Sequence, residues 1–239
     1  MKKYNPKSLF KSLWISVLIL TVFIWFYPVN ISILRYFLIL ALPFLLCGVS
    51  VFIWRRKRIR YLPFIITVII VIFILIPGRS RNKERLRIQY ARCLEKYEGV
   101  RYIWGGETFL GIDCSGLVRK GLIDALFYEG IQTLNPELIR NSLFLWWNDC
   151  SARSLKEGYR NLTTPLFDAE SVNSIKTDQL EVGDIAVTSD GVHVLAYLGN
   201  NSWIEADPGI RKVIKAETPV KDNPWFEMKI KVLRWNILK

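Results

Sequence analysis

The stretch YIWGG at residues 102–106, followed by GIDCSGLV at residues 111–118, predicts a loop that turns into a helix. Glycines interrupt any regular pattern before Asp113, and apolar residues recur at helical spacing after it. Aspartate is a preferred N-cap, so Cys114 is expected at the first turn of the helix. A thiol at a helix start has a lowered pKa and lies beside unpaired N–H groups that can hold an oxyanion, as a nucleophile requires.

A nucleophilic cysteine needs a base, and the chain contains a single histidine, His193. It lies in DGVHVLAYLG, residues 190–199, a strand pattern bounded by glycines. A cysteine, then a histidine on a strand, then a polar group on the next strand is the order typical of papain-like catalysis. Without the cysteine motif, a lone histidine would be interpreted as a core residue satisfied by the backbone.

Four separated sequence blocks together resemble the NlpC-type family of papain-like cell-wall endopeptidases. They are Y-x-W-G-G, D-C-S-G-L-V, L-x-x-G-D-I at residues 180–185 and H-V-x-x-Y-L-G-N at residues 193–200. The resemblance covers roughly residues 85–239. It implies that Cys114 is the nucleophile and His193 the general base, and that neither a metal nor an organic cofactor is needed.

The third catalytic group departs from the family pattern. In the family this residue is usually His, Asn or Gln on the strand after the histidine strand, and the matching position here is Glu205. A carboxylate can accept the Nδ1–H of the histidine and stabilise the charged ring better than an amide would. Asp207 has the same strand parity and is the alternative; a surface glutamate is the plainer interpretation of Glu205.

The resemblance also assigns three residues near the nucleophile. Tyr102 matches a family tyrosine whose hydroxyl faces the oxyanion or the substrate, and its alternative role is a core aromatic. Asp113 and Ser115 match positions that bind the free amino end of a stem peptide, although Asp113 also serves as the helix cap. Trp104 is interpreted as structural, like the glycines that follow it.

Composition favours a membrane protein over a nucleic-acid-binding one. The chain is 51% hydrophobic, and this apolar excess is concentrated in runs within the first 77 residues. The net charge of +12 arises largely from basic clusters beside these apolar runs. Nucleic acid is therefore not an expected partner. The four cysteines include no C-x-x-C pair, which argues against structural zinc. Cys93 and Cys150 pair only if their domain faces an oxidising compartment, and two separate thiols are the alternative.

Three apolar runs predict about three transmembrane helices, at residues 9–27, 31–54 and 61–77, with two helices as the alternative. A signal peptide is disfavoured because no small-residue cleavage site follows the first run. Lysines before the first run and arginines at residues 55–60 place the N-terminus in the cytoplasm, so three crossings put the C-terminal domain outside. Arginines after the third run argue the other way, but domains of this size translocate largely regardless of charge.

Residues 1–78 are therefore predicted as a membrane anchor and residues 79–239 as the catalytic domain. Helices come first, at residues 79–98 and after Cys114, and a small antiparallel sheet follows, which predicts an α+β papain-like fold. A connection longer than is usual in the family suggests a helical insertion at about residues 130–179. The predicted strands are residues 184–187, 192–198, 202–206, 211–214 and 228–235.

These observations predict a multi-pass protein of the bacterial cell membrane with an extracytoplasmic cysteine peptidase domain. The resemblance implies a peptidoglycan stem-peptide substrate cut between D-glutamate and the diamino acid, with the lipid bilayer as the other partner. One alternative is an amidase, transpeptidase or acyltransferase acting on a membrane-proximal lipid-linked substrate. Another is a catalytically silent membrane scaffold, which the presence of Cys114 and His193 opposes.

Overall fold

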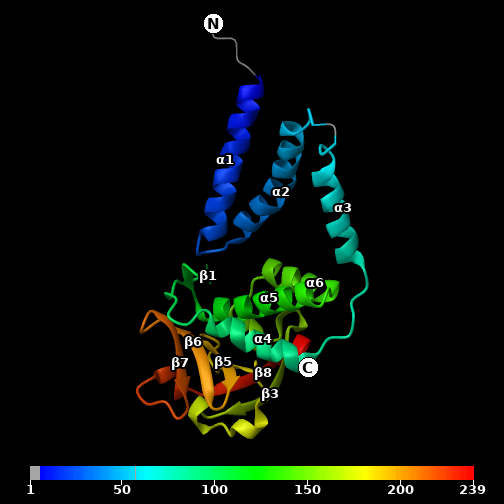
Figure 1. Ribbon diagram of the computed structural model, residues 1–239. Helices are drawn as coiled ribbons and strands as arrows, with labels where there is room; N and C mark the ends of the chain where they lie inside the picture. The colour runs from blue at the N-terminus through cyan, green and yellow to red at the C-terminus, as the bar shows by residue number, and fades with distance from the viewer. Residues whose placement is uncertain (1–5, 57) are drawn as a thin grey trace. The chain divides into compact units, whose positions relative to one another are not determined.

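The computed structural model describes residues 6–56 and 58–239 (Figure 1). The chain forms two compact units that divide between Ile76 and Pro77. Each unit has its own architecture, and the two are described separately.

The N-terminal unit consists of three helices, α1 (Pro6–Phe26), α2 (Ser32–Phe52) and α3 (Leu62–Leu75). Among the described residues, α1 and α2 are the two helices long and apolar enough to cross a membrane. The predicted third span is only partly helical, since α3 has 14 residues. At 1.5 Å per residue it covers about 21 Å of a hydrocarbon core of roughly 30 Å.

The end of α3 explains why the predicted span of residues 61–77 was too long. Ile76 has extended backbone angles and leaves the helix. It precedes Pro77, and the proline ring disfavours helical geometry at the residue before it. The apolar run therefore continues in sequence beyond the point where the helix can.

The C-terminal unit, residues 77–239, confirms the α+β fold: helices cover one side of a six-stranded antiparallel sheet (Figure 1). The strand order is β3-β8-β4-β5-β6-β7, and a separate two-stranded hairpin is formed by β1 and β2. The helices are α4 (Lys83–Glu95), α5 (Cys114–Gln132), α6 (Pro136–Trp147) and α7 (Ala152–Lys156). The strands are β1 (Glu107–Thr108), β2 (Gly111–Ile112), β3 (Thr163–Ala169), β4 (Ile185–Thr188), β5 (Val194–Gly199), β6 (Ser202–Asp207), β7 (Lys212–Glu217) and β8 (Ile230–Trp235). Short 3₁₀ turns are η1 (Tyr159–Asn161), η2 (Val172–Ser174), η3 (Thr177–Gln179), η4 (Pro224–Phe226) and η5 (Asn236–Leu238).

Five of the six sheet strands lie where the sequence predicts them, with ends shifted by no more than three residues. The predicted helical insertion is helical only in its first part, α6 and α7. Its second part contains β3, which pairs with β8 at the edge of the sheet. Pro165 is tolerated within β3 because an edge strand leaves one row of donors unpaired.

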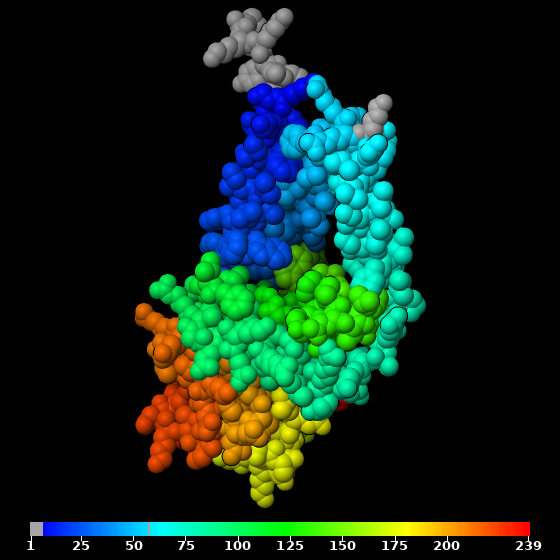
Figure 2. All heavy atoms as spheres, viewed as in Figure 1, coloured from blue at the N-terminus to red at the C-terminus, as the bar shows by residue number. Residues whose placement is uncertain are grey.

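Two apolar clusters cover the two faces of the sheet. The larger lies between the sheet and helices α4 and α5, and the smaller lies under η2 and η4. Alternation along each strand sends neighbouring side chains to opposite clusters, as with Ile204 in the larger and Trp203 in the smaller. In Figure 2 the atoms of the green helices lie directly against those of the orange strands. By this alternation Glu205 points to the face covered by η4.

Candidate active site

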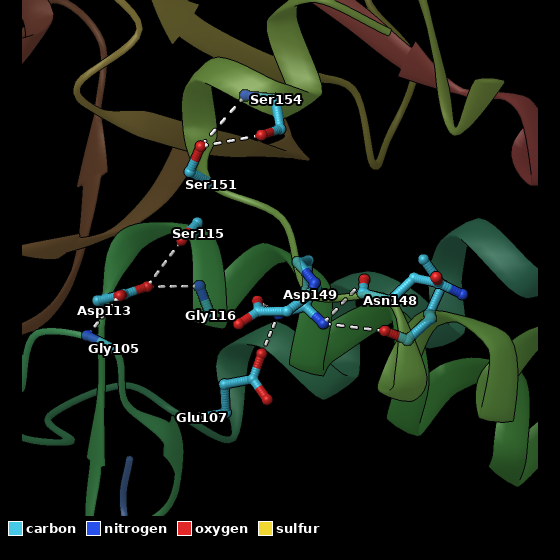
Figure 3. Close-up of polar contacts among 11 residues, drawn as sticks. Gly105, Glu107, Asp113, Ser115, Gly116, Asn148, Asp149, Ser151 and Ser154 are labelled. Atoms are coloured by element: carbon cyan, nitrogen blue, oxygen red, sulfur yellow. Dashed lines mark hydrogen bonds and ion pairs between the residues drawn. The ribbon is translucent and has the colours of Figure 1, made fainter. Parts of the chain in front are cut away.

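Cys114 is the first residue of α5, and Asp113 is the N-cap that sequence analysis predicts. The Asp113 backbone is extended, and its Oδ1 accepts hydrogen bonds from Gly116 N at 2.6 Å and Ser115 Oγ at 3.0 Å (Figure 3). An N-cap of this kind is worth about 1 kcal/mol. Cys114 is 7% exposed, and its Sγ lies 3.9 Å from Val192 O.

The second oxygen of Asp113 holds the preceding loop against the helix start. Its Oδ2 accepts a hydrogen bond from Gly105 N at 2.7 Å, and Asp113 N donates to Gly106 O at 3.1 Å. A Cβ on Gly116 would lie 2.2 Å from Gly106 O, so only glycine permits this approach. Asp113 therefore fixes both the nucleophile's helix and the loop that carries Tyr102.

His193 lies at the end of the β4–β5 turn, where Thr188 and Asp190 position it. Its backbone N donates to Thr188 Oγ1 at 3.0 Å, and the same hydroxyl donates to Asp190 Oδ1 at 2.6 Å. The ring is buried, and its Nε2 is 2.5 Å from Glu205 Oε2. Sequence analysis expected the carboxylate at Nδ1, and this was wrong. Because the bond to Glu205 uses Nε2, Nδ1 is the nitrogen left for the Cys114 thiol.

The surroundings of His193 favour its protonated form. Burial alone would lower the pKa of His193, but hydrogen bonds and charge interactions with Cys114 and Glu205 outweigh burial and raise the pKa to about 9. The imidazole therefore holds its proton at neutral pH while it contacts both the sulfur and the carboxylate.

The His193–Glu205 pair is supported by two residues that sequence analysis did not single out. Asn223 Nδ2 donates to Glu205 Oε1 at 2.6 Å, and the Trp225 ring stacks on His193 with centroids 4.2 Å apart. Both residues come from the segment around η4. The alternative orienting residue, Asp207, is engaged elsewhere: its Oδ1 accepts from Gly209 N at 2.6 Å and Ile210 N at 3.2 Å. The DNPW pattern at residues 222–225 is a turn signal, but it gives no sign of contact with His193.

Tyr102 and Ser115 both line the cleft that opens beside Cys114. Burial raises the pKa of Tyr102 above its usual value, and the negative charges of Cys114 and Asp113 add to that effect. Tyr102 is thus a half-buried, neutral phenol at the cleft, and its ring also packs against the larger core cluster.

The cleft has a volume of about 540 Å³ and is built from four segments. They are the loop of residues 102–107, the start of α5, the turn of residues 149–154 and residues 191–192. Trp104 lies at its margin and is 82% exposed, so its side chain faces the cleft and solvent. The expectation that Trp104 is structural was therefore wrong.

The family model that matches this chain is that of the NlpC/P60 family, over residues 99–234. The chain belongs to the NlpC/P60 family. Members of this family are cysteine peptidases. Cys114, His193 and Glu205 all lie within the matched range.

A curated relative of this NlpC/P60 chain is the murein DD-endopeptidase MepS/murein LD-carboxypeptidase of Escherichia coli K12. It is 29% identical over 137 residues, which are 56% of this chain and 54% of that protein. The chain thus spans about half the length of the curated relative it matches. Among solved structures, the peptidoglycan hydrolase RipB from Mycobacterium tuberculosis aligns at 24% identity and a TM-score of 0.41, over 65% of this chain and 68% of that chain. The NlpC/p60 domain of the peptidoglycan hydrolase SagA aligns at 20% identity and a TM-score of 0.36, over 61% of this chain and 97% of that chain.

The NlpC/P60 domain of this chain contains a buried ionic network that sequence analysis missed. Arg119 is 1% exposed, and its Nη1 donates to Glu107 Oε1 and, at 2.6 Å, to Asp149 Oδ1 (Figure 3). Its Nη2 donates to two backbone carbonyls at the end of α6, Leu145 O at 2.9 Å and Asn148 O at 3.3 Å. An arginine on the otherwise apolar face of the predicted catalytic helix was the signal that could have found it.

Cys93 and Cys150 are separate thiols, both buried in the larger core cluster. Within the part of the chain that the structure describes, no group of three or more His, Cys, Asp or Glu side chains is arranged to hold a metal ion.

Proposed function

We propose that this protein is a membrane-anchored cysteine endopeptidase that hydrolyses peptidoglycan stem peptides at the γ-D-glutamyl–diamino acid bond. Cys114, His193 and Glu205 form its catalytic triad. The observation that carries the proposal is His193, which contacts the Cys114 thiol on one side and the Glu205 carboxylate on the other, beside an open cleft.

The first half of the reaction transfers the acyl group to sulfur. The His193 imidazole holds the thiol proton, and the Cys114 thiolate attacks the amide carbonyl. The oxyanion lies by the first turn of α5, where the N–H groups of Cys114 and Ser115 have no intrahelical partner. The imidazolium then donates its proton to the leaving amine, and a thioester remains on Cys114.

The second half hydrolyses the thioester. Neutral His193 removes a proton from water, and the hydroxide adds to the thioester carbonyl. The imidazolium then returns the proton to the Cys114 sulfur as the C–S bond breaks, and the product leaves with its new carboxyl group. Glu205 stabilises the imidazolium in both halves, and Asn223 fixes the carboxylate through its other oxygen. The Tyr102 hydroxyl supplies a neutral donor beside the sulfur.

Membrane anchoring is proposed from α1 and α2, which have the length and composition of spans. An extracytoplasmic catalytic domain needs an odd number of crossings from a cytoplasmic N-terminus, so the proposal requires α3 to cross as well. The helix carries no charge between Leu62 and Leu75, and a short span is accommodated by local thinning of the bilayer. Basic residues that follow it suit anionic lipid or an anionic wall polymer.

The name of the E. coli relative supports a second candidate bond. That protein is named as a murein DD-endopeptidase and LD-carboxypeptidase. In this second candidate function, Cys114 of this chain attacks either a DD cross-link or the bond before the C-terminal residue of a stem peptide. The three bonds differ in the masses of their products, so one experiment separates them.

The test uses the full chain in detergent, with the Cys114→Ala variant as control. Each is incubated with purified peptidoglycan, a γ-linked tripeptide stem, a cross-linked dimer and a tetrapeptide, and products are identified by mass. We expect cleavage after D-glutamate by the native protein alone. Added amine acceptors that appear in the product would favour the transferase alternative. A thiol probe that fails to label Cys114, together with no cleavage, would favour the silent scaffold.

A further inference from the structure

The turn between α6 and α7, residues 148–151, forms a wall of the catalytic cleft together with the N-terminal end of α7. It belongs to the segment that sequence analysis identified as longer than usual in the family. Figure 3 shows Asp149 from this turn facing Glu107 from β1. The Arg119 guanidinium lies between the two carboxylates.

The charges of the Arg119 network sum to a negative value. One guanidinium nitrogen, Arg119 Nη1, serves two carboxylates, so Arg119, Glu107 and Asp149 together carry a charge of minus one. Glu107 is buried, whereas the Asp149 side chain is 55% exposed. Asp149 is therefore the exposed carboxylate that this network presents at the cleft, within a protein whose overall charge is +12.

Two further charged residues, Arg153 and Asp113, line the cleft. Arg153, on the same wall, carries a positive charge, and its Nη2 donates to Asp190 O at 3.4 Å. Asp113 adds a further negative charge to the cleft lining, and both of its oxygens accept hydrogen bonds from the chain. A cation bound in the cleft thus meets Asp149 as the exposed carboxylate of the turn.

The network contains a donor that the chain leaves unmet. Arg119 Nε is buried and has no acceptor among the described residues, although Arg119 lines the cleft. A buried charge with an unmet donor destabilises the fold relative to an apolar side chain of the same size. Its retention at the wall is explained if Arg119 is a positioning residue that holds Asp149 and the turn for a ligand.

We propose that Asp149 is a specificity-determining residue that binds a primary ammonium group of the substrate, the side-chain amine of the diamino acid. This inference rests on the proposed function, because it assigns a subsite to the same cleft. An ammonium has three donors and one positive charge, so it pairs with an exposed carboxylate at little desolvation cost. Arg119 keeps that carboxylate in the cleft when the ammonium is absent.

The experiment compares three synthetic γ-D-glutamyl peptides that differ only in the residue after the glutamate: lysine, Nε-acetyl-lysine and norleucine. The full chain in detergent is assayed for kcat/KM on each, as are Asp149→Asn and the control Glu157→Gln. Asparagine still accepts from Arg119, so the fold is retained, and Glu157 is an exposed acid on the same segment, outside the cleft. Binding of the same peptides to Cys114→Ala, alone and combined with Asp149→Asn, is measured by calorimetry.

We expect the native protein to prefer the lysine peptide by at least tenfold over the other two. Asp149→Asn should reduce that ratio to below threefold without lowering kcat/KM on the norleucine peptide, and Glu157→Gln should keep the native ratio. Arg119→Lys should also lower the ratio, mainly through KM, because lysine cannot bridge both carboxylates and both carbonyls.

The outcomes separate the subsite from the reaction. Cleavage without preference for the amine, or an undiminished preference in Asp149→Asn, overturns the subsite and leaves the proposed function standing. If no peptide is cut but Cys114→Ala binds the lysine peptide in an Asp149-dependent way, the subsite stands and the proposed reaction fails. Neither cleavage nor binding overturns both.

Discussion

Glu205 Oε2 and His193 Nε2 lie 2.5 Å apart, and both side chains are almost completely excluded from solvent. A buried carboxylate at this distance contributes to the raised pKa of His193, which reaches about 9. An amide at position 205 could accept the same hydrogen bond but would contribute no charge.

Replacing Glu205 by Gln should therefore change the pH profile more than the geometry. Without the carboxylate the pKa of His193 falls, so the alkaline limb of kcat/KM, set near pH 9 by loss of the imidazolium, should move to lower pH. At neutral pH we expect a loss of about tenfold, equivalent to about 1.4 kcal/mol of transition-state stabilisation. Asp207→Asn is the matched control, and an unshifted limb in Glu205→Gln would show that the carboxylate does not tune His193.

The same pKa predicts how stability depends on pH. The folded pKa of His193, about 9, is above the ordinary value of 6.5, so the charged ring stabilises the fold. This contribution, about 3 kcal/mol, is complete below pH 6.5 and is lost as the pH rises towards 9. Thermal unfolding of the full chain from pH 6 to pH 10 should show this decline, and His193→Gln should flatten it. An equal decline in both proteins would contradict the assignment.

Removal of the aromatic ring that stacks on His193 should slow catalysis without weakening substrate binding. In Trp225→Ala the imidazole loses its stacking partner, a contact worth about 0.5–1.5 kcal/mol. We expect kcat to fall several-fold at nearly constant KM, and Trp225→Phe to restore most of it. Trp104→Ala is the contrasting variant: its ring is 82% exposed, so KM should change while the melting temperature does not.

Cys114 should be the thiol that reacts first with an alkylating probe at neutral pH. Cys93, Cys114 and Cys150 are all buried, and Cys114 and Cys150 both line the cleft, but Cys114 is the thiol that interacts with His193 through a hydrogen bond and its charge. Mass spectrometry of the full chain labelled with limiting iodoacetamide should find the label on Cys114. Labelling should drop at least tenfold in His193→Asn, because the thiolate loses its imidazolium partner. Preferential labelling of Cys150 would contradict the assignment.

In the proposed topology, the side of the membrane that the C-terminal domain faces depends on α3. We expect a C-terminal alkaline phosphatase fusion, active only outside the cytoplasm, to be active on the full chain. Deletion of residues 62–75 should abolish that activity, because two crossings return the domain to the cytoplasmic side. Activity that persists after the deletion would show that α3 does not cross.

Local chemistry explains which parts of the site were predictable. Asp113 and Cys114 are adjacent in sequence, and a helix cap needs only its own first turn. Glu205 lies one hairpin away from His193, so strand parity was enough to place both side chains on one face. Asn223 and Trp225 belong to an irregular segment, and no periodicity links Asn223 to Glu205, 18 residues earlier, or Trp225 to His193, 32 residues earlier. The ion pairs of Arg119 were equally unpredictable from the sequence, because tertiary packing alone brings β1 and the α6–α7 turn into contact with it.

The N-terminal helices show the same limit. Hydropathy alone predicts three apolar runs, and the structure has three helices there, but hydropathy does not say where a helix stops. The extended backbone of Ile76 before Pro77 ends α3 after Leu75. Strand β3 was missed for a related reason, since its irregular pairing with β8 is broken between Pro165 and Phe167.

The α6–α7 turn has an evolutionary consequence. The thiol, the imidazole and the carboxylate come from α5 and the sheet, while one wall of the cleft comes from a separate stretch of chain. Insertions, deletions or recombination within that stretch can alter which peptides are accepted, while the positions of the thiol, the imidazole and the carboxylate stay unchanged. Under the proposed function, substrate range and reactivity are therefore separable properties, and exchange of this stretch between homologous enzymes becomes a practical route to new selectivity.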